Sequence, residues 1–531
     1  MSLFVWFALL LLVIVLFGAI RYRLRDMPLE RDEGEYAYAG QLMLQGIPPY
    51  SLAYNMKLPG IYAAYAAIFA VFGETPAAIH TGLLLVNAAT AICLFFLVSR
   101  LFGNMAAFVA GASYVLLSTS SSVMGFEAHA TNFVLLPALL GILFLLRAME
   151  SGRLWHFFAS GVLLGIAVLM KQHGVFFVLF CLLYLGLVRW KERQRLQFVR
   201  EGLLFGSGVA LPYVAACVLL LRAGVFRAFW FWTVDYAGEY SKMGLRRAVR
   251  AFLENSRTVV SPAVLVWILA AAGIIALFWS SSARRHSYFL WLLLVCSFLA
   301  LCPGAYFRVH YYILLLPVVA ILAGVAVSSA TEKFADLGTP RIIEFVPVLV
   351  FLACFGFAVW SERNVYFSMD ADAAMRSTYG DNAFLPAMKI ADYLKENSPP
   401  GASIAVLGSE PEIYFYARRH SAISYIYMYS LIVRHRYTAR MRAEMMQELE
   451  ANRPQYVVYV DSFDSWGDRA GQQPAEFLSG LHDYMNREYG VVGIAEIGER
   501  PEYFWGSAAE SYLPESPNAI YVLKRRADLP E

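Results

Sequence analysis

Charged side chains are scarce in this chain. Of its 531 residues, only 16% are Asp, Glu, Lys or Arg, whereas 59% are hydrophobic. Soluble globular domains contain about 25% charged residues, so the composition excludes a single water-soluble globular protein. The formal net charge of +3 is also small, and it gives no support to a general nucleic-acid-binding role.

Closely spaced cysteines, phosphate-binding loops and repeats are missing as well. None of the six cysteines forms a Cys-x-x-Cys pair, and all lie in or at the ends of apolar runs. We therefore expect them to be small buried hydrophobic residues, and we expect neither a zinc site nor a disulfide framework. The sequence contains no glycine-rich phosphate loop, internal repeat or low-complexity tract.

The N-terminus lacks the features of a cleaved signal peptide. It has no positively charged n-region, its apolar run extends from Leu3 to Ile20, and no small-residue cleavage site precedes Arg21. Residues 3–20 are therefore expected to form a retained first transmembrane helix.

What the chain does contain is a series of long apolar runs. A helix needs about 20 residues to cross a bilayer. The run 155–189 is long enough for two helices, with a turn at Lys171-Gln172-His173-Gly174. The expected spans are residues 3–20, 77–98, 104–120, 130–147, 155–170, 173–189, 202–221, 259–279, 288–302, 310–328 and 342–360. The sequence thus predicts a polytopic α-helical membrane domain over residues 1–360, with about eleven transmembrane helices.

Basic residues are concentrated in alternate loops between these spans. Short cytoplasmic loops carry an excess of Lys and Arg, and five short basic loops fall on one side. They contain Arg100; Arg147 and Arg153; Arg189, Lys191, Arg193, Arg195 and Arg200; Arg284 and Arg285; and Lys333 and Arg341. Arg21, Arg23 and Arg25, together with the long basic loop 222–258, oppose this assignment. Since we give the five short loops more weight, we expect the first external loop, 21–76, and the C-terminal part to lie outside the cytoplasm, on an inner cell membrane.

The composition changes after residue 360. We expect a linker over residues 361–383 and a soluble α/β domain over residues 384–531, because strands and helices alternate there. The expected strands are 404–407, 456–460 and 520–523, and the expected helices are 385–394 and 434–450. In the first external loop, we expect residues 35–45 to form a helix on the membrane surface, and residues 60–72 another surface helix or a re-entrant segment.

The first external loop contains the acidic sequence Arg31-Asp32-Glu33-Gly34-Glu35. Such a run can be an ordinary solvated loop. It can also be catalytic, because one carboxylate can act as general base on a hydroxyl while its neighbour binds a cation or a sugar hydroxyl. Asp32 and Glu33 are therefore candidate catalytic residues and candidate ligands of a divalent metal.

Several other ionisable residues fall on the same side of the membrane. They are Lys57, Glu127, His129, Lys171, Arg308 and His310. Each can have a structural role, as part of a headgroup-facing loop, as a snorkelling anchor or beside an aromatic belt. Ionisable groups at this depth also mark functional sites, and cations bind phosphate. An acidic pair with several cations suits transfer from a phosphate leaving group, and a polyprenyl tail on the substrate would explain why the enzyme is embedded in a bilayer.

The order of these motifs resembles a known family. The chain contains Asp32-Glu33-Gly34-Glu35-Tyr36, Gly46, Lys57-Leu58-Pro59-Gly60, Glu127 ahead of Leu135-Leu136-Pro137, Lys171-Gln172, and His310-Tyr311-Tyr312 ahead of Leu315-Leu316-Pro317. It is similar in this to bacterial GT-C class glycosyltransferases related to protein O-mannosyltransferases, a class that includes the lipid A aminoarabinose transferase. The segment 407–414 is similar to the external domain of many bacterial members.

The resemblance implies a lipid-phosphate sugar donor and an inverting transfer outside the cytoplasm. It implies that Asp32 is the base, that Glu33 assists or binds a cation, and that Lys57 lies near the donor phosphate. Where many relatives have Glu-Lys-Pro-Pro, this chain has Met56-Lys57-Leu58-Pro59. No cofactor is certain, and the need for a divalent metal stays open because relatives differ. The acceptor could be lipopolysaccharide, another glycolipid, a cell-wall glycan or a protein, and the sugar a hexose or a pentose.

Two other functions fit a polytopic chain. A secondary transporter would place ionisable residues near the middle of the bilayer and often shows inverted repeats, whereas here they gather at one face. A non-catalytic scaffold would display the C-terminal domain without needing the acidic pair, yet Asp32 and Glu33 are present. We therefore expect a membrane glycosyltransferase.

Overall fold

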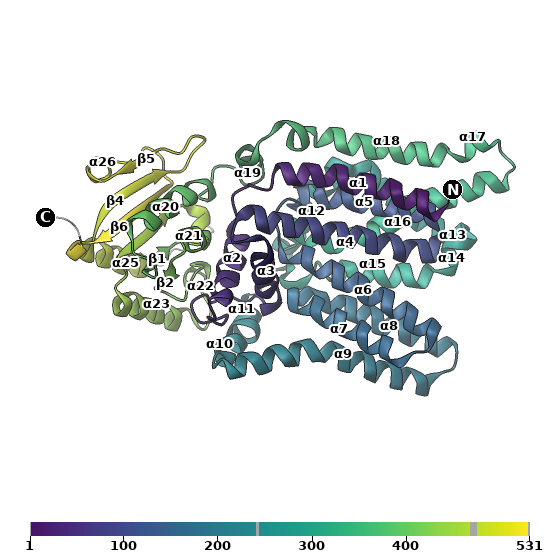
Figure 1. Ribbon diagram of the computed structural model, residues 1–531, viewed down its shortest axis with the longest axis horizontal. Helices are drawn as coiled ribbons and strands as arrows, with labels where there is room; N and C mark the ends of the chain where they lie inside the picture. Colours follow the sequence, from purple (N-terminus) through teal and green to yellow (C-terminus); the bar gives the residue numbers. More distant parts are fainter. Residues whose placement is uncertain (1, 241–243, 468–474, 529–531) are drawn as a thin grey trace.

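The computed structural model describes residues 2–240, 244–467 and 475–528. Figure 1 shows two parts along the long axis: a bundle of helices that run roughly alongside one another, and a smaller domain built on a β-sheet at one end. The N-terminus lies at the end of the bundle far from the sheet, and the C-terminus lies at the outer edge of the sheet domain.

Helices make up nearly all of the bundle. A helix satisfies its backbone hydrogen bonds within one segment, as an apolar bilayer requires. The helices at the expected spans are α1 (Leu3–Arg23), α4 (Pro76–Phe102), α5 (Asn104–Thr119), α6 (Ala130–Ser151), α7 (Leu154–Met170), α8 (Val175–Lys191), α9 (Arg195–Arg222), α13 (Val264–Trp279), α15 (Ser287–Leu299), α16 (Leu316–Asp336) and α18 (Val346–Ser361). Each expected span overlaps one of them, so the prediction of a polytopic helical protein is confirmed.

Length divides these helices into two classes. Within the described residues, eight helical segments are long and apolar enough to cross a membrane: Leu3–Arg23, Pro76–Phe102, Ala130–Ser151, Gln172–Lys191, Arg195–Arg222, Leu245–Trp279, Leu316–Asp336 and Ile342–Ser361. The helices α5, α7 and α15 are apolar but shorter. In α5, residues 106–119 are all buried inside the bundle, so this helix packs against protein rather than lipid. Length and composition therefore identify eight spans and not the full eleven.

Glycine allows two of the bundle helices to approach closely. A Cβ atom added at Gly161 of α7 would overlap the Phe205 carbonyl of α9, and one added at Gly208 of α9 would overlap the Phe158 carbonyl of α7. In a bilayer, close packing of backbones rather than the hydrophobic effect drives helix association. These two glycines thus allow the backbones of α7 and α9 to come into direct contact.

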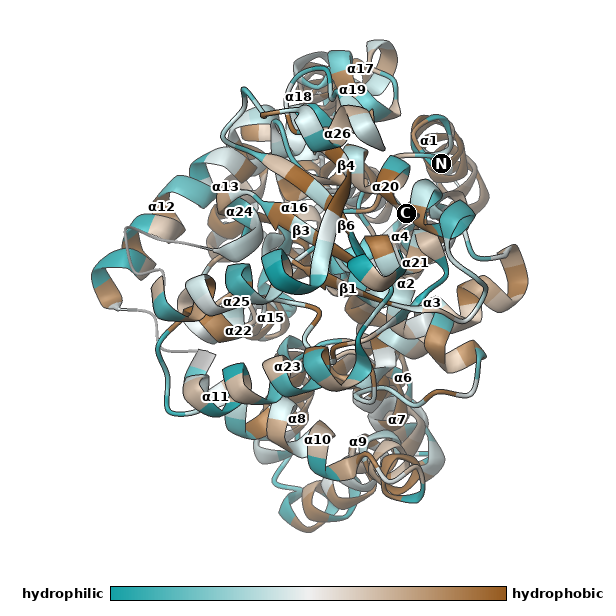
Figure 2. Ribbon diagram, turned by 90° about the vertical axis from the view of Figure 1, so that its left-hand side faces the viewer, coloured by the Kyte–Doolittle hydropathy of each residue, from teal (hydrophilic) through white to brown (hydrophobic). Residues whose placement is uncertain are grey.

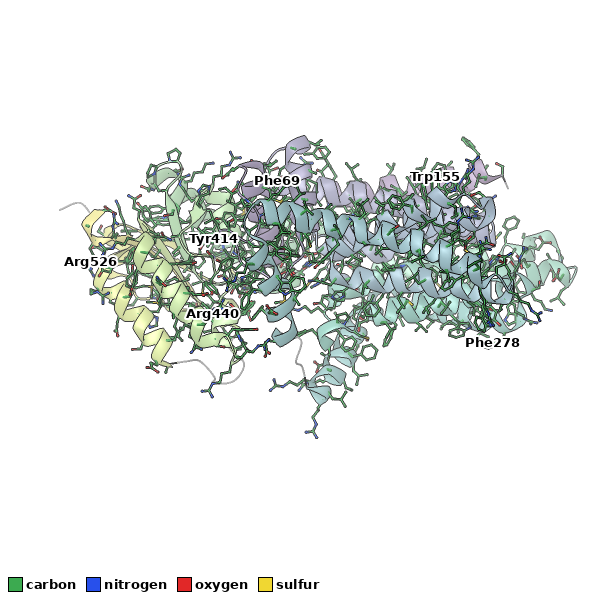
Figure 3. All side chains as sticks on the ribbon, turned by 90° about the horizontal axis from the view of Figure 1, so that it is seen from below. Phe69, Trp155, Phe278, Tyr414, Arg440 and Arg526 are labelled. Carbon is green, nitrogen blue, oxygen red and sulfur yellow. The ribbon has the colours of Figure 1, made fainter. Side chains whose placement is uncertain are left out.

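Two short helices, α2 (Arg31–Leu44) and α3 (Pro59–Phe72), lie between the bundle and the sheet domain (Figure 1). Residues 33–42 of α2 are all buried, because Tyr38 stacks on Tyr414 and Phe69 of α3 stacks on Phe415. Figure 3 labels Phe69 and Tyr414 at this junction. The expected helices are present, but the prediction of a surface helix over residues 35–45 is wrong, since the sheet domain covers it.

The connection between the two parts is also structured. The expected linker, 361–383, contains a π-helical turn, Asn364–Ser368, and helix α19 (Ala371–Tyr379). At its start, Glu362 accepts hydrogen bonds from the backbone nitrogen and the hydroxyl of Ser121, at 3.1 and 2.8 Å. The beginning of the connection is thus held against the turn that follows α5.

The C-terminal domain contains a mixed six-stranded sheet with the strand order β2-β1-β3-β6-β4-β5. The strands are β1 (Ser403–Leu407), β2 (His420–Ser421), β3 (Tyr456–Asp461), β4 (Tyr489–Glu496), β5 (Tyr503–Trp505) and β6 (Ala519–Arg525). β1 pairs in parallel with β2 and β3, whereas β6 pairs antiparallel with β3 and β4, and β5 antiparallel with β4. Its helices include α20 (Phe384–Asn397), α21 (Glu412–Ala417), α22 (Tyr429–Ile432), α23 (Thr438–Asn452) and α25 (Ala475–Glu488).

The three expected strands and both expected helices of this domain are present, and three strands were missed. The missed strand β4 contains a register shift between Val491 and Gly493, and such a bulge breaks the two-residue alternation that marks a strand in sequence. Figure 2 looks onto this end of the molecule and shows hydrophobic residues along β4, with many hydrophilic residues on α23 and α25.

Candidate active site

A cavity of about 570 Å³ lies where the bundle, the first external loop and the sheet domain meet. The candidate residues Asp32, Lys57, His129, Lys171, Arg308 and His310 all line it. They come from five separate stretches of the chain, so the structure brings together six of the eight residues expected from the sequence. Glu33 and Glu127 are not among the residues that line it.

The start of α2 directs Asp32 into the cavity. Glu30 caps the helix: its carboxylate accepts a hydrogen bond from the Glu33 nitrogen at 2.8 Å, and the Glu33 carboxylate accepts one from the Glu30 nitrogen at 3.4 Å. This reciprocal pattern fixes the first turn. Asp32 lies between the two capping residues and keeps its carboxylate for the cavity, close to a helix N-terminus that favours negative charge.

Glu33 is turned away from the cavity and is fully buried. Its carboxylate accepts a hydrogen bond from the Ala128 nitrogen at 2.6 Å and lies 3.0 Å from His80 Nε2. Glu33 therefore joins α2 to the loop before α6 and to α4. Nothing in the sequence distinguished Glu33 from Asp32, and His80, within an apolar run, was not singled out.

Asp32 forms an ion pair inside the cavity. Its Oδ1 lies 3.1 Å from Lys57 Nζ, and its Oδ2 lies 3.8 Å from His129 Nδ1. Burial by itself would raise the pKa of Asp32, but the neighbouring cations, above all Lys57, hold the pKa well below its usual value. In return, Asp32 raises the pKa of Lys57, against the effect of burial. Without a ligand, Asp32 is thus a carboxylate paired with a charged lysine.

Three other basic groups carry lowered pKa values. Burial lowers the pKa of Lys171, whose amine lies 4.3 Å from the centre of the Tyr311 ring, and the positive charge of Lys57 lowers it further. Burial also lowers the pKa of His129 to about 4 and that of His310 well below its usual value. Cations that are held close together away from water lose protons unless an anion compensates their charge. The cavity therefore favours an anionic ligand.

Glu127 lies behind the cavity wall. It is buried, and its Oε2 has no hydrogen-bond partner among the described residues. Burial, with the negative charge of Glu33, raises the pKa of Glu127 to about 8. The raised pKa favours a neutral carboxyl at this position, which contributes little charge to the cavity.

Asp32, His129 and His310 form a group that could bind a metal ion. One possible ligand atom from each lies within 4.8 Å of the others, and the two imidazole rings stack with their centroids 4.1 Å apart. Both ring nitrogens of His129 and the Nε2 of His310 have no hydrogen-bond partner among the described residues. One carboxylate and two imidazoles suit a divalent cation, so these residues fit a metal. The sequence left the metal ligands open, with Asp32 and Glu33 as candidates, and the structure places Glu33 against His80 instead.

The sheet domain contributes residues that the sequence did not indicate. Tyr427, Tyr429 and Ser430 line the cavity, as does Phe384 of α20. Tyr427 lies in the loop before α22, Tyr429 and Ser430 lie in the first turn of α22, and no acidic or basic residue stands between 420 and 434 to mark them. Only the position of the domain over the bundle could have identified them.

A family model also matches part of the chain. Residues 57–228 match the family described as dolichyl-phosphate-mannose-protein mannosyltransferase. This stretch includes Lys57, His129 and Lys171. No curated protein matches the sequence significantly.

Solved structures with a similar fold cover nearly the whole chain. ArnT from Cupriavidus metallidurans bound to undecaprenyl phosphate has a TM-score of 0.61 at 14% identity, over 98% of both chains. The apo state of the same ArnT has a TM-score of 0.60 at 15% identity, over 97% of both chains. An oligosaccharyltransferase from Archaeoglobus fulgidus in the apo form has a TM-score of 0.52 at 13% identity, over 96% of this chain and 75% of that chain.

These findings confirm the resemblance that the motifs indicated. The chain has the fold of ArnT over nearly its whole length, including a C-terminal sheet domain, and residues 57–228 are similar to the protein mannosyltransferases.

Proposed function

We propose that this chain is an integral membrane glycosyltransferase that moves a hexose or pentose from a polyprenyl-phosphate donor to a hydroxyl acceptor, with inversion at the anomeric carbon. One observation carries the proposal: the Asp32 carboxylate shares its cavity with Lys57, Lys171 and Arg308. A carboxylate suits the acceptor hydroxyl, and cations suit a leaving phosphate. The similar fold of ArnT, whose structure contains undecaprenyl phosphate, supports a donor of this class.

The donor phosphate would bind among the cations. Burial and mutual repulsion lower the pKa values of Lys171 and His310 in the free protein. The negative charge of a phosphate bound between them would compensate their positive charges and favour their protonated forms. The lysines and Arg308 would then stabilise the negative charge that develops on the phosphate as the sugar leaves.

Asp32 would act as the base in the transfer step. The acceptor oxygen bonds to the anomeric carbon from the face opposite the phosphate, while the bond from this carbon to the phosphate oxygen breaks and its electron pair leaves with the phosphate. Asp32 takes the proton from the hydroxyl. In the free protein Lys57 binds Asp32 at 3.1 Å. A phosphate that binds Lys57 would weaken this pairing and raise the pKa of Asp32, which makes the carboxylate a stronger base.

A divalent cation would be held by Asp32, His129 and His310. It would supply additional positive charge next to the leaving phosphate. Transfer assays with and without a chelator decide whether the reaction uses this group.

We place the reaction on the extracytoplasmic face of an inner cell membrane. The cavity is lined by residues of α2 and α22, and these elements lie at the end of the bundle next to the sheet domain (Figure 1). Trp155 and Phe278 mark the opposite end in Figure 3, and Arg153 precedes Trp155 by two residues in the chain. Short basic loops face the cytoplasm in most membrane proteins, and this supports the orientation. The acceptors that fit are lipopolysaccharide, another glycolipid, a cell-wall glycan or a protein.

The experiment is a transfer assay on the protein purified in detergent. Labelled polyprenyl-phosphate sugars serve as donors and crude membranes supply acceptors, and wild type is compared with Asp32→Asn. We expect wild type to transfer sugar and Asp32→Asn to lose activity by about 100- to 10,000-fold, the usual contribution of a general base.

Asp26→Asn is the matched control, because Asp26 is exposed and pairs with Arg25 outside the cavity. It should retain wild-type activity. An active Asp32→Asn enzyme would show that the base lies elsewhere. A wild-type protein that transfers sugar from none of the donors would overturn the proposed function.

A further inference from the structure

A tyrosine of the sheet domain reaches the candidate base of the membrane domain. The Tyr427 hydroxyl lies 2.9 Å from the Arg31 carbonyl oxygen and 3.3 Å from Asp32 Oδ1, so its single proton is shared between these two acceptors. Tyr427 also lines the cavity. Since 395 residues separate Tyr427 from Asp32 in the chain, only the position of the sheet domain against the bundle brings the two groups together.

The residue next to Asp32 is bound to the turn after β1. Arg31 Nε donates to the Ser409 carbonyl at 2.5 Å, and Arg31 Nη2 lies 3.0 Å from Glu410 Oε1. The other oxygen of Glu410 accepts a hydrogen bond from the Ser465 hydroxyl at 2.6 Å. Both carboxylate oxygens of Glu410 are thus engaged, and the first turn of α2 is held firmly against the sheet domain.

The same turn also holds Tyr427. The Ser409 hydroxyl accepts a hydrogen bond from the nitrogen of Met428 at 3.0 Å, and the Ser409 nitrogen donates to the Ser465 hydroxyl at 2.9 Å. Ser409 therefore binds Arg31 through its carbonyl and the neighbour of Tyr427 through its hydroxyl. The tyrosine and the acidic motif are positioned by one turn of the chain.

The close contact between α2 and α21 leaves this arrangement little freedom. A Cβ atom added at Gly34 would lie 2.6 Å from the Glu412 nitrogen and 2.7 Å from its Cβ. The glycine thus allows the two backbones to meet. A shift of the sheet domain relative to α2 would separate Tyr427 from Asp32.

The hydrogen bond from Tyr427 selects one oxygen of Asp32. Lys57 binds the same atom, Oδ1, at 3.1 Å. The other oxygen, Oδ2, lies 3.8 Å from His129. With Oδ1 occupied by Tyr427 and Lys57, Oδ2 is the oxygen that can receive a proton from an acceptor.

We infer that Tyr427 is a positioning residue, which holds Asp32 Oδ1 so that Oδ2 is directed at the acceptor hydroxyl, and that the sheet domain is for this reason a part of the reaction site. The inference rests on the proposed function. When the donor phosphate draws Lys57 away from Asp32, Tyr427 remains as the group that holds Oδ1. The domain then does more than cover the cavity, because it supplies a hydrogen bond needed during transfer.

The test compares Tyr427→Phe with Tyr425→Phe in the transfer assay. Both variants lose one hydroxyl from the same loop, but the Tyr425 hydroxyl donates to Glu444 within the sheet domain and does not line the cavity. We expect Tyr427→Phe to lower kcat about tenfold, the effect of losing one hydrogen bond to a charged group. We expect the KM for the donor to stay within about twofold, because donor binding relies on the cations.

The split between kcat and KM separates positioning from a general loss of structure. Lost positioning lowers kcat and leaves the KM for the donor nearly unchanged, whereas a loosened domain would change both values. Equal kcat values in the two variants would overturn the inference while the proposed function stands. A wild-type protein without transfer activity overturns the proposed function, and the inference falls with it.

A second variant tests the turn without altering the tyrosine. Ser409→Ala removes the hydroxyl that binds the Met428 nitrogen, and we expect it to lower kcat by about threefold. If Ser409 acts through Tyr427, the double variant Ser409→Ala/Tyr427→Phe has the same kcat as Tyr427→Phe alone. Effects that simply multiply would contradict a shared role.

Discussion

Two short acidic segments meet where the sheet domain contacts the bundle, and their surroundings differ. Residues 31–35 contain Asp32, which opens into a cavity lined by cations. Residues 409–412 contain Glu410 and Glu412, both buried and outside the cavity. Glu410 is engaged by Arg31 and Ser465, and Glu412 has no hydrogen-bond partner among the described residues.

The difference shows what gives a carboxylate a chemical role. Cations hold the pKa of Asp32 well below its usual value, so it is charged and ready to change partners when an anion enters. Burial, followed by the charge of Glu410, raises the pKa of Glu412 well above its usual value, which favours the neutral form of its carboxyl. A carboxylate can take part in chemistry when it opens into a cavity that also holds cations. The same residue type buried between two packed elements has only a structural role.

The largest expected effect comes from replacing a carboxylate in each of the two segments. Asp32→Asn should remove activity by about 100- to 10,000-fold, whereas the equivalent exchange of a carboxyl for an amide, Glu412→Gln, should leave the transfer rate within about threefold, since the neutral Glu412 already resembles an amide. Rates from the same donor and membrane acceptor measure both. Similar losses in the two variants would mean that the second segment also takes part in the chemistry.

The next effect concerns the cations that share the cavity with Asp32. Lys171→Met should weaken the binding of undecaprenyl phosphate by about 10- to 100-fold, the effect of one hydrogen bond between charged groups. Lys191→Met is the matched control, because Lys191 ends the helix that follows Lys171 and its amine lies 3.4 Å from the centre of the Tyr288 ring. Titration of the two variants with undecaprenyl phosphate gives the two dissociation constants. Equal dissociation constants would show that Lys171 does not bind the phosphate.

A smaller effect is the pH dependence of phosphate binding at Lys171. The pKa of Lys171 is lowered in the free protein by burial and by Lys57, and a bound phosphate raises it. Binding therefore takes up a proton. Affinity should be highest below the lowered pKa of the free protein and should fall as pH rises towards the pKa in the complex, by up to about tenfold per pH unit.

Above about pH 7.5 the phosphate itself no longer titrates. A change of affinity with pH in this range therefore comes from a group of the protein. Calorimetric titrations in two buffers of different ionisation enthalpy measure the proton uptake. Lys171→Met should show less uptake than wild type, and an identical uptake would assign the proton to another group.

The smallest expected effect belongs to the closed segment. Because its pKa is raised in the folded protein, Glu412 holds its proton there to a higher pH than in the unfolded chain, which releases it above about pH 4.3. This favours the folded state below pH 4.3, and the advantage is lost as pH rises towards the raised pKa of Glu412. Glu412→Gln should match wild type near pH 4 and have a Tm higher by about 2–4 °C at neutral pH. Thermal unfolding at the two pH values measures this, and a constant difference would contradict a buried neutral carboxyl.

Local patterns in the sequence were sufficient for much of the fold. Runs such as 77–98 and 130–147 are too apolar and too long for a soluble protein, and each lies on a helix, α4 and α6. The strands 404–407 and 456–460 followed from β-branched residues between turns. β4 did not, because its glycines and its bulge between Val491 and Gly493 hide the alternation.

The candidate site was predictable in its residue types but not in its arrangement. Asp32 and Glu33 are neighbours in the sequence, yet only Asp32 faces the cavity, because the capping of α2 turns Glu33 towards His80. Glu127 and His129 differ in the same way. They are two residues apart, and only His129 lines the cavity.

The sequence by itself determined that this protein crosses a membrane through many helices, because hydrophobic length and local charge are properties of single segments. It also determined which ionisable residues were available at one face. Only the tertiary structure decided which of them meet, and that Tyr427 of the sheet domain reaches Asp32. Such contacts join residues hundreds of positions apart, and they depend on how two folded parts pack together, which no local pattern encodes.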